Sequence, residues 1–586
     1  MQDGEVRLLE RLRRVTNPPV EVISQPYLSG FRADAAVFDP QRGVVLYEVK
    51  DYWFEDGTAP TGFGRLGVEL KRKPTGGWYQ LGRDPVEQVL QYKDLLLDEC
   101  ALLSGSARAW RKLVKAVVVM TDASTSAAQA WARERLNWPH DAVVVFGGKD
   151  LHRLGPHELI PLPPHENKLM GEHAESLRTF LDHPRVVKDM RVRLELSRQQ
   201  REIAETRTPT GRRRIKGAAG CGKTQALAAR ACELSHEGKS VLVTCYNATL
   251  PNYLRVLFLR HKVSPDGEPW GDPSKVVFMH FHRWATWVID RGGRKGDRLA
   301  LDFDSDEDER AYGVLVQSVL AHQREQAPPF RFDAVLVDEG QDFYAEWWQA
   351  LERVCTPEGE MLVVADDTQD LYRRGSRWTE RMPGFRKWMT LQEGHRAPAE
   401  LIPVLQSFAD RYLASPRNPD VYLPHGPEQP SLAQCYLRWV SATDQQPLAP
   451  RVDEELRRLR REGVHDGDIA VLVTSNQCGE LLARHLRRRG YHLTDVFGED
   501  GRRKKRAFRP LTGRISLSTI HSYKGWESRA TILVLDTATR SGTITNTLVY
   551  VGLTRVRASL GRSYLTVING SRSFEDWGKD AFPRRY

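Results

Sequence analysis

The stretch Gly217-Ala218-Ala219-Gly220-Cys221-Gly222-Lys223-Thr224 spells G-x-x-x-x-G-K-T and opens an alanine-rich, helix-forming run. Gly217, Gly220 and Gly222 let the backbone wrap its N–H groups around a phosphate, and a following helix adds a favourable dipole. Lys223 is then expected to reach the β- and γ-phosphates, and the Thr224 hydroxyl to ligate Mg²⁺. A glycine-rich turn without a ligand is the plain alternative, and the full spacing argues against it. The stretch predicts a loop that binds a nucleoside triphosphate.

Length and composition set the limits of the interpretation. A chain of 586 residues exceeds what one core usually organises, so we expect three or more compact units. The net charge of +10 favours a polyanionic partner, with nucleic acid the first candidate and a membrane surface the second. The seven cysteines include no C-x-x-C pair, which argues against a zinc or iron–sulfur site and predicts a reducing, cytoplasmic setting. A polar N-terminus and the lack of a long apolar run predict neither a secretory signal nor a membrane span.

A second chemical signal follows the apolar run 332–337, which ends at Asp338 and Glu339. A buried strand of this kind delivers its last residues to the carboxyl edge of a parallel sheet. Asp338 is expected to hold Mg²⁺, usually through a water, and Glu339 to polarise the attacking water. An isolated Asp-Glu pair is more often a surface turn, but the phosphate loop upstream favours the catalytic interpretation.

The sequence Asp338-Glu339-Gly340-Gln341-Asp342 resembles motif II of the UvrD/Rep-type superfamily 1 helicases, and further motifs follow in the family's order over about two thirds of the chain. The matching positions are Gln200 in the Q motif, Tyr246 and Asn247 in motif Ia, Phe281 and His282 in the next DNA-contact motif, Gln369 in motif III, His395 and Arg396 in motif IV, His521 and Glu527 in motif V, and Arg555 in motif VI.

The resemblance implies a role for each of the nucleotide-site positions. Gln200 would contact the adenine edge, and Glu527 the ribose. His395 stands where the family usually has a tyrosine that stacks on the base, so base selectivity is expected to be looser. Arg396 and Arg555 would reach the γ-phosphate, Arg555 as an arginine finger. Taken singly, each arginine would more often be a solvated surface charge.

The resemblance also implies contacts to a nucleic-acid strand. Gln369 would couple the γ-phosphate to those contacts. The strand-contact positions would be Tyr246, Asn247, Phe281, His282 and the region of His521. Aromatic side chains can stack on bases, although any one of these rings also fits a place in the protein core.

The N-terminal region carries a separate constellation. Two apolar runs, 33–38 and 44–50, flank a turn and predict a β-hairpin. If the hairpin is symmetric about its turn, Asp34 lies opposite Glu48, and Lys50 lies on the same face as Glu48. Two carboxylates held so close call for a cation, and oxygen ligands suit Mg²⁺ or Mn²⁺. Lys50 could orient a water and stabilise the charge that develops on a phosphate.

This pattern resembles the PD-(D/E)xK nuclease core, and the leading helix makes it most similar to the nuclease-related (NERD) branch. Glu5 matches the upstream acidic position of that fold and would join the metal ligands. Gln88 and Tyr92 form a Q-x-x-x-Y pair like that of RecB-type nucleases. A solvated strand face with Glu48 and Lys50 as an ordinary surface pair is the alternative. A folded but inactive nuclease-like module is another.

The expected organisation is α/β throughout. A restriction-endonuclease-like mixed sheet is followed by a connector and by two RecA-like lobes with parallel sheets and ATP between them. The expected bounds are 1–165 for the nuclease-related unit, 166–195 for the helical connector, 196–390 for the first lobe and 391–586 for the second.

Three functional hypotheses follow. The first is an ATP- and Mg²⁺-dependent DNA helicase or translocase with a fused metal-dependent nuclease domain, acting in DNA repair or in defence against foreign DNA. Its partner would be DNA that is single-stranded or has single-stranded regions, with no membrane. The second is a motor whose N-terminal module only binds DNA or a protein partner. The third is an ATP-dependent switch that senses a nucleic acid. Polarity, strand separation, RNA against DNA, and oligomeric state stay open.

Overall fold

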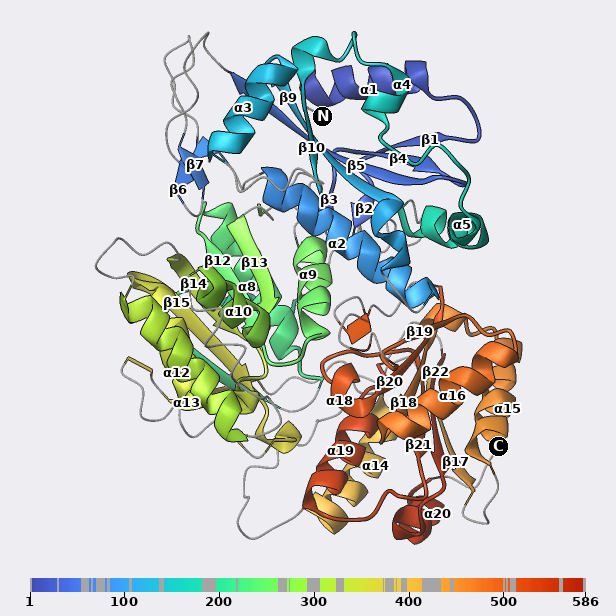
Figure 1. Ribbon diagram of the computed structural model, residues 1–586. Coiled ribbons are helices and arrows are strands. Elements are labelled where there is room, and N and C mark those ends of the chain that lie inside the picture. The colour runs from blue at the N-terminus through green and yellow to red at the C-terminus, as the bar shows by residue number, and fades with distance from the viewer. Residues whose placement is uncertain are drawn as a thin grey trace. The chain divides into compact units, whose positions relative to one another are not determined.

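The computed structural model divides into two compact units, Met1–Asp189 and Met190–Tyr586, which are described separately (Figure 1). The structure describes residues 3–28, 31–53, 63–64, 67–69, 80–81, 85–104, 108–135, 142–181, 196–217, 220–261, 271–272, 275–291, 306–322, 331–372, 374, 384–385, 387–391, 398–413, 434–442, 447–498, 501, 504–505, 508, 513–557 and 562–582.

A five-stranded mixed sheet forms the centre of the first unit, in the order β1-β4-β5-β9-β10. Its strands are β1 (Glu21–Ser24), β4 (Ala35–Asp39), β5 (Gly43–Trp53), β9 (Val114–Asp122) and β10 (Val144–Gly147). The first three run antiparallel to their neighbours, whereas β9 and β10 run parallel to β5. Short strands β2 (Tyr27–Leu28) and β3 (Phe31–Arg32) pair with each other, as do β6 (Phe63–Gly64), β7 (Gly67–Glu69) and β8 (Gln80–Leu81).

The predicted hairpin is confirmed by the register of β4 and β5, in which Phe38 pairs with Val44 and Asp39 with Gly43. Gly43 has φ +145°, and a Cβ there would lie 2.1 Å from the carbonyl oxygen of Leu113. Only glycine can therefore let the hairpin approach the start of β9 so closely.

Alternate residues of β5 face opposite layers, as expected for a strand buried on both sides. Val45 and Tyr47 pack against α1 (Asp3–Val15), while Val44 and Leu46 share a core with α2 (Pro85–Ser104). Two cores consequently sandwich the sheet.

The other α-helices among the described residues of this unit are α3 (Thr125–Arg135), α4 (Pro156–Leu159) and α5 (Lys168–Leu181). α5 lies inside the range expected for the connector, 166–195, and its Met170, Leu177 and Leu181 belong to the same core as α2. This helix is thus packed into the first unit. Residues 182–195 lie outside the described residues.

The second unit contains two lobes, each built on a six-stranded, wholly parallel sheet. The first lobe, within 196–391, has the order β13-β12-β14-β15-β11-β16. Its strands are β11 (Arg212–Gly217), β12 (Val241–Cys245), β13 (Val276–His280), β14 (Phe332–Val337), β15 (Cys355–Ala365) and β16 (Met389–Leu391). The predicted strand 332–337 is confirmed by β14.

Helices cover both faces of the first lobe's sheet (Figure 1). One face packs against α8 (Lys223–His236) and α9 (Leu250–His261), and α7 (Arg198–Glu205) adjoins α8. The other face packs against α10 (Phe281–Arg291), α12 (Asp306–His322) and α13 (Ala345–Val354). Near-continuous apolar strands such as β14 are what a sheet buried on both faces requires.

The second lobe, within 398–582, has the strand order β17-β22-β21-β18-β20-β19. Its strands are β17 (Gln434–Ser441), β18 (Ile469–Val473), β19 (Leu493–Asp495), β20 (Ile515–Thr519), β21 (Ala530–Leu535) and β22 (Arg562–Asn569). Its helices are α14 (Ile402–Phe408), α15 (Leu448–Arg461), α16 (Asn476–Arg488), α18 (Ile520–Tyr523), α19 (Thr543–Leu553) and α20 (Glu575–Ala581).

The described part of the chain is therefore α/β, as expected, and its three large sheets are one mixed sheet and two parallel sheets. Parallel strands gather the loops that follow them at the carboxyl edge, which is where the chemical motifs of both lobes occur. Among the described residues, no helix is long and apolar enough to cross a membrane.

Candidate nucleotide site and candidate metal site

The phosphate-loop motif connects β11 to α8, as its spacing predicts. Gly220 and Gly222 adopt φ values of +78° and +83°, in the left-handed region that favours glycine. A Cβ on Gly222 would lie 2.0 Å from Nε2 of Gln200. The loop therefore depends on glycine for its backbone angle and for the space beside it.

Lys223 is buried at the start of α8 with its ammonium group directed into the loop. Nζ donates to the carbonyl oxygen of Gly217 at 2.6 Å and to Oδ2 of Asp366 at 3.2 Å. Burial alone would lower the pKa of Lys223, but the carboxylates of Asp366 and Glu339 raise it above its ordinary value. The lysine consequently stays charged at neutral pH, and Asp366 supplies its counter-charge.

Asp338 follows β14 and its backbone N–H donates to the carbonyl oxygen of Thr244 at 2.9 Å. Burial, and next the neighbouring Glu339, raise the pKa of Asp338 to about 7, while the hydroxyl of Thr224 opposes the rise. Oδ1 accepts the backbone N–H of Glu339 at 3.0 Å, whereas the buried Oδ2 meets no donor in good hydrogen-bond geometry among the described residues. A buried carboxylate oxygen beside a threonine hydroxyl fits the oxygen ligands that Mg²⁺ prefers.

Glu339 occupies a strained position, because its φ of +54° is unusual for any residue with a side chain. Oε2 accepts from Nε2 of Gln341 at 2.5 Å and lies 3.2 Å from Nζ of Lys524. Burial would raise the pKa of Glu339, but Lys524 and then Lys223 lower it below its ordinary value. The carboxylate is thus ionised at neutral pH, as a base must be.

A continuous path of polar contacts joins the two lobes. From Asp366, whose Oδ2 binds Lys223, the path continues to Nε2 of Gln369 at 2.7 Å. Oε1 of Gln369 then accepts from Arg555 of the second lobe at 2.9 Å. The expected arginine finger and the lysine of the phosphate loop are therefore connected through two side chains of the first lobe.

Lys524 makes a second connection between the lobes. This residue follows α18 in the second lobe, and its Nζ lies 2.8 Å from both carboxylate oxygens of Asp342 and 2.9 Å from the carbonyl oxygen of Gln369. A buried ammonium with this many acceptors is held firmly, because an unpaired charge there would be costly. Lys524 thus fixes the second lobe to the carboxylates of the first.

Four other predicted nucleotide contacts have different outcomes. Gln200 is the third residue of α7, where Oε1 accepts from the backbone N–H of Ser197 at 2.9 Å and Nε2 donates to the carbonyl oxygen of Cys221 at 3.1 Å. Its amide therefore ties α7 to the phosphate loop in this structure. Glu527 is partly buried after α18. His395 and Arg396 lie outside the described residues.

The predicted strand contacts divide into two groups. Phe281 is fully buried, with its ring stacked 4.3 Å from that of Trp347, so it packs the core of the first lobe. Tyr246 is only partly buried, and its hydroxyl donates to Glu309 at 3.1 Å. Burial, and next the charge of Arg374, lower the pKa of His282 to about 4.

Asn247 and His521 lie together at the junction of the lobes. Nδ2 of Asn247 donates to the carbonyl oxygens of His521 and Lys524, each at 3.1 Å. Burial, and next Lys524, lower the pKa of His521 to about 4. Asn247 therefore holds the segment that carries Lys524.

In the first unit, the structure brings the expected hairpin residues together. Oδ2 of Asp34 accepts the backbone N–H of Val49 at 2.6 Å, and Lys50 forms a short ion pair with Glu48. Burial, and next Glu48, raise the pKa of Asp34 to about 8. Burial also raises the pKa of Glu48. The hydroxyl of Tyr92 interacts with the Glu48 carboxylate and opposes the rise, although the buried Oε2 meets no donor in good hydrogen-bond geometry among the described residues.

The predicted metal ligands Glu5, Asp34 and Glu48 agree only in part with the geometry of the hairpin. Glu5 interacts electrostatically with the hairpin carboxylates, and Nε2 of Gln25 donates to it at 3.5 Å. Within the described ranges, however, no three His, Cys, Asp or Glu side chains gather closely enough to hold a metal ion. The trio Glu5, Asp34 and Glu48 is not a closed ligand set here. Because Mg²⁺ commonly keeps several waters and takes one or two carboxylates, Asp34 and Glu48 fit such an ion.

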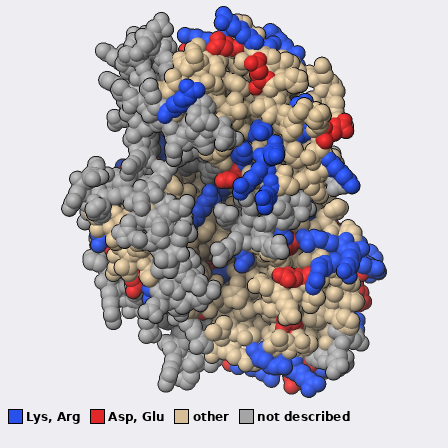
Figure 2. Space-filling model, in the orientation of Figure 1, with Lys and Arg blue, Asp and Glu red and all other residues tan. Residues whose placement is uncertain are grey.

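Basic side chains gather over α15 and α16 on the second lobe (Figure 2). Several are paired with acids, as Arg457 is with Asp453 at 2.5 Å and Arg460 with Asp466 at 2.6 Å. These pairs reduce the charge that the surface offers to a polyanion, and exposed pairs contribute little stability.

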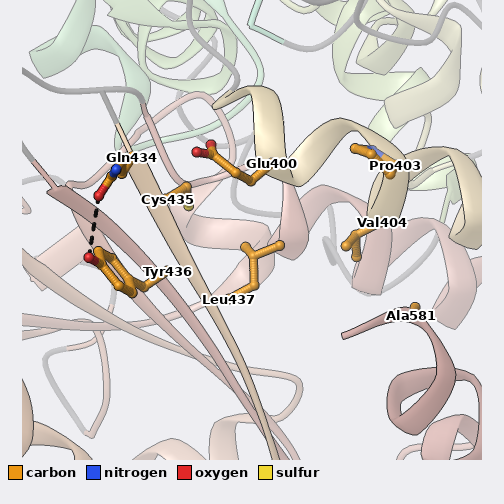
Figure 3. A pocket seen from close by; sticks show the side chains of 8 residues that line it. All are labelled: Glu400, Pro403, Val404, Gln434, Cys435, Tyr436, Leu437 and Ala581. Atoms are coloured by element: carbon orange, nitrogen blue, oxygen red, sulfur yellow. Dashed lines mark hydrogen bonds between the residues drawn. The ribbon is translucent and has the colours of Figure 1, made fainter. Parts of the chain in front are cut away.

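A pocket of about 330 Å³ lies elsewhere in the second lobe (Figure 3). Residues of α14 and β17 line it, together with Glu400 and Ala581, and its titratable groups are Glu400, Cys435 and Tyr436. Burial raises the pKa of the Cys435 thiol, which keeps it protonated and unreactive. This pocket has no set of groups that would perform chemistry.

Sequence reasoning missed four residues that the structure places at these sites. Asp366 and Lys524 stand inside motifs III and V, so their place in those motifs was an available signal. Glu309 and Arg374 contact Tyr246 from separate segments. No local pattern announces such a contact.

No family model matches the chain, and no curated protein matches its sequence. The motifs and the contacts between them are thus the basis for any assignment of function.

Proposed function

We propose that this protein is an ATP-dependent nucleic-acid motor of the superfamily 1 helicase type, with two RecA-like lobes and a fused nuclease-like unit. DNA with a single-stranded region is its proposed substrate, and ATP hydrolysis its proposed reaction. Repair or defence against foreign DNA is the proposed setting.

One observation carries the proposal more than any other. The path from Lys223 through Asp366 and Gln369 to Arg555 joins a phosphate-loop lysine to an arginine of the other lobe. Stability of the fold alone does not require these motif residues to contact one another in sequence. A two-lobe ATPase does, because its rate depends on charges from both lobes meeting at one phosphate.

The residues suggest how hydrolysis would proceed. Lys223 and the loop backbone would bind the phosphates, and Thr224 with Asp338 would hold Mg²⁺, which neutralises phosphate charge when bound. Glu339, already ionised, would accept the proton of the attacking water. Arg555 would stabilise charge that develops on the transferred phosphoryl group.

The contacts also suggest how nucleotide and strand would communicate. A γ-phosphate on Lys223 competes with the carboxylate of Asp366, because both are anions that need the same ammonium group. Released from that lysine, Asp366 would no longer fix Gln369, and Arg555 would be free to turn towards phosphate. The lobes would consequently close on nucleotide and reopen after hydrolysis.

We propose that the nuclease-like unit hydrolyses phosphodiester bonds of DNA, with Asp34, Glu48 and Lys50 as its catalytic groups. The raised pKa values of the carboxyl groups of Asp34 and Glu48 support a cation site, because a bound cation would favour their charged forms. Lys50 would stabilise the developing charge on phosphate.

Steady-state ATP hydrolysis with and without single-stranded DNA tests the motor. We expect the strand to stimulate the wild-type rate at least about tenfold, and Lys223→Ala to remove the stimulated rate. Lys239→Ala, an exposed lysine of the same lobe, should behave as wild type. If the rate of ATP hydrolysis were the same with and without single-stranded DNA, the result would argue against a translocase and favour a nucleotide switch.

A further inference from the structure

Arg374 is enclosed by aromatic rings in the first lobe. Its guanidinium carbon lies 3.9 Å from the ring centre of Tyr344, 4.7 Å from that of Tyr246 and 5.1 Å from that of Tyr372. The side chain is only 5% exposed. A cation that has lost its water in this way interacts strongly with an anion placed at its open edge.

The anion at that edge is Glu309, in the first turn of α12. Its carboxylate forms a short ion pair with Arg374, accepts the Tyr246 hydroxyl at 3.1 Å and lies 3.8 Å from Nε2 of His282. We call these three partners the Glu309 site. Tyr246 and His282 are the positions at which strand contacts were expected.

We propose that the Glu309 site binds one phosphodiester group of a nucleic-acid strand, and that Glu309 is an internal substitute which the strand displaces. This inference rests on the proposed function and names a place where the strand binds. A guanidinium and a hydroxyl are common donors to backbone phosphates. Exchanging one carboxylate for one phosphodiester also conserves the charge that Arg374 requires.

Glu309 can leave the site while α12 stays in place. The helix is held by its other contacts, since Tyr312 and Thr286 share a hydrogen bond of 2.5 Å and Gln317 donates to the carbonyl oxygen of Glu346 at 2.8 Å. The Glu309 carbonyl oxygen separately accepts Nε1 of Trp347 at 2.7 Å. Rotation of one side chain would thus open the site.

The site is connected to the catalytic carboxylates. Arg374 donates to the backbone carbonyl oxygen of Asp342 at 2.7 Å, and the side chain of Asp342 holds Lys524 at 2.8 Å. Lys524 in turn lies 3.2 Å from Glu339. Arg374 is therefore connected to Glu339 by three contacts through two intervening residues, which is a route by which a bound strand would stimulate hydrolysis.

Glu309→Gln provides the test, because it keeps the shape of the side chain and removes its charge. Binding of a fluorescent single-stranded oligonucleotide would be followed by anisotropy at fixed salt. We expect about tenfold tighter binding, the difference between a charge-assisted and a neutral hydrogen bond. Glu237→Gln removes one exposed charge from the same lobe and should change affinity little.

The gain should depend on Arg374. Arg374→Ala should weaken binding, and adding Glu309→Gln to it should restore nothing. If Glu309→Gln and Glu237→Gln increased the affinity for the oligonucleotide equally, the cause would be a general electrostatic effect. That result would overturn the proposal. The proposal would also be overturned if the wild type bound the oligonucleotide and Glu309→Gln bound it with the same affinity. This test holds even if Arg374→Ala fails to fold. If neither wild type nor Glu309→Gln binds the strand, the proposed function itself fails.

Discussion

The candidate nucleotide site and the candidate metal site of the hairpin balance their buried charges in opposite ways. Around the phosphate loop, Lys223 and Lys524 each face carboxylates, so the charges are balanced by side chains of the protein. In the hairpin, Asp34 and Glu48 both interact with Lys50, the one cation that acts on both carboxyl groups among the described residues. A balanced site requires a ligand to displace an internal partner, whereas a site with excess negative charge attracts a cation directly.

The largest expected effect would test the balanced site. Glu339→Gln should keep the shape of the site but remove the base, and we expect kcat for ATP hydrolysis to fall about 10²- to 10⁴-fold. Nucleotide affinity, measured by titration calorimetry, should change little. Glu358→Gln, an exposed acid of the same lobe, is the control. Full activity in Glu339→Gln would mean that the motif II carboxylate is structural.

A smaller effect is expected in the hairpin. Lys50→Ala should reduce Mg²⁺-dependent cleavage of DNA about a hundredfold, because it removes the group that stabilises developing phosphate charge. Gel analysis of a labelled oligonucleotide would measure the loss, with the exposed Lys112→Ala as its match in the same unit. Cleavage at the wild-type rate, or no cleavage by the wild type itself, would discard the nuclease assignment and leave a binding module.

The smallest effect is a dependence of stability on pH. The folded state raises the pKa of Asp34 from 3.8 to about 8, so it retains a proton that the unfolded chain releases. Without a divalent ion, the free energy of unfolding should therefore fall as pH rises from 3.8 towards about 8, and it should level off above that pH. In EDTA, raising the pH should lower the Tm of the wild type by about 3 °C more than that of Asp34→Asn. Mg²⁺ should make this difference smaller.

Calorimetric scans of both proteins between about pH 6 and pH 9 would measure this difference. Parallel pH profiles in EDTA would contradict the excess-charge account of the hairpin. Asp94→Asn, on the exposed side of α2, should follow the wild-type profile.

The sequence predicted those features that depend on local spacing. Counting residues outward from the centre of the turn predicted that Asp34 lies opposite Glu48, because a hairpin with a short turn has few possible strand registers. The phosphate loop and strand 332–337 were predictable for the same reason: glycine spacing and apolar runs act within about ten residues. Both are visible in a single segment of the chain.

Contacts between distant segments were not predictable. Phe281 fits a strand-contact motif, yet the packing of α10 against α13 places its ring in the core. Gln200 was expected to contact adenine, but its amide is used at the start of α7 and in the phosphate loop. The pairing of Glu309 with Arg374 depends on how α12 is placed, which no local pattern encodes.

We propose that Arg555 of the second lobe acts on a nucleotide held by the first lobe. The rate of ATP hydrolysis by Arg555→Ala, compared with the exposed Arg562→Ala of the same lobe, tests it most directly. We predict a fall of about a thousandfold or more for Arg555→Ala, with little change in ADP affinity, because the side chain acts on the γ-phosphate. A wild-type rate in Arg555→Ala would contradict the account.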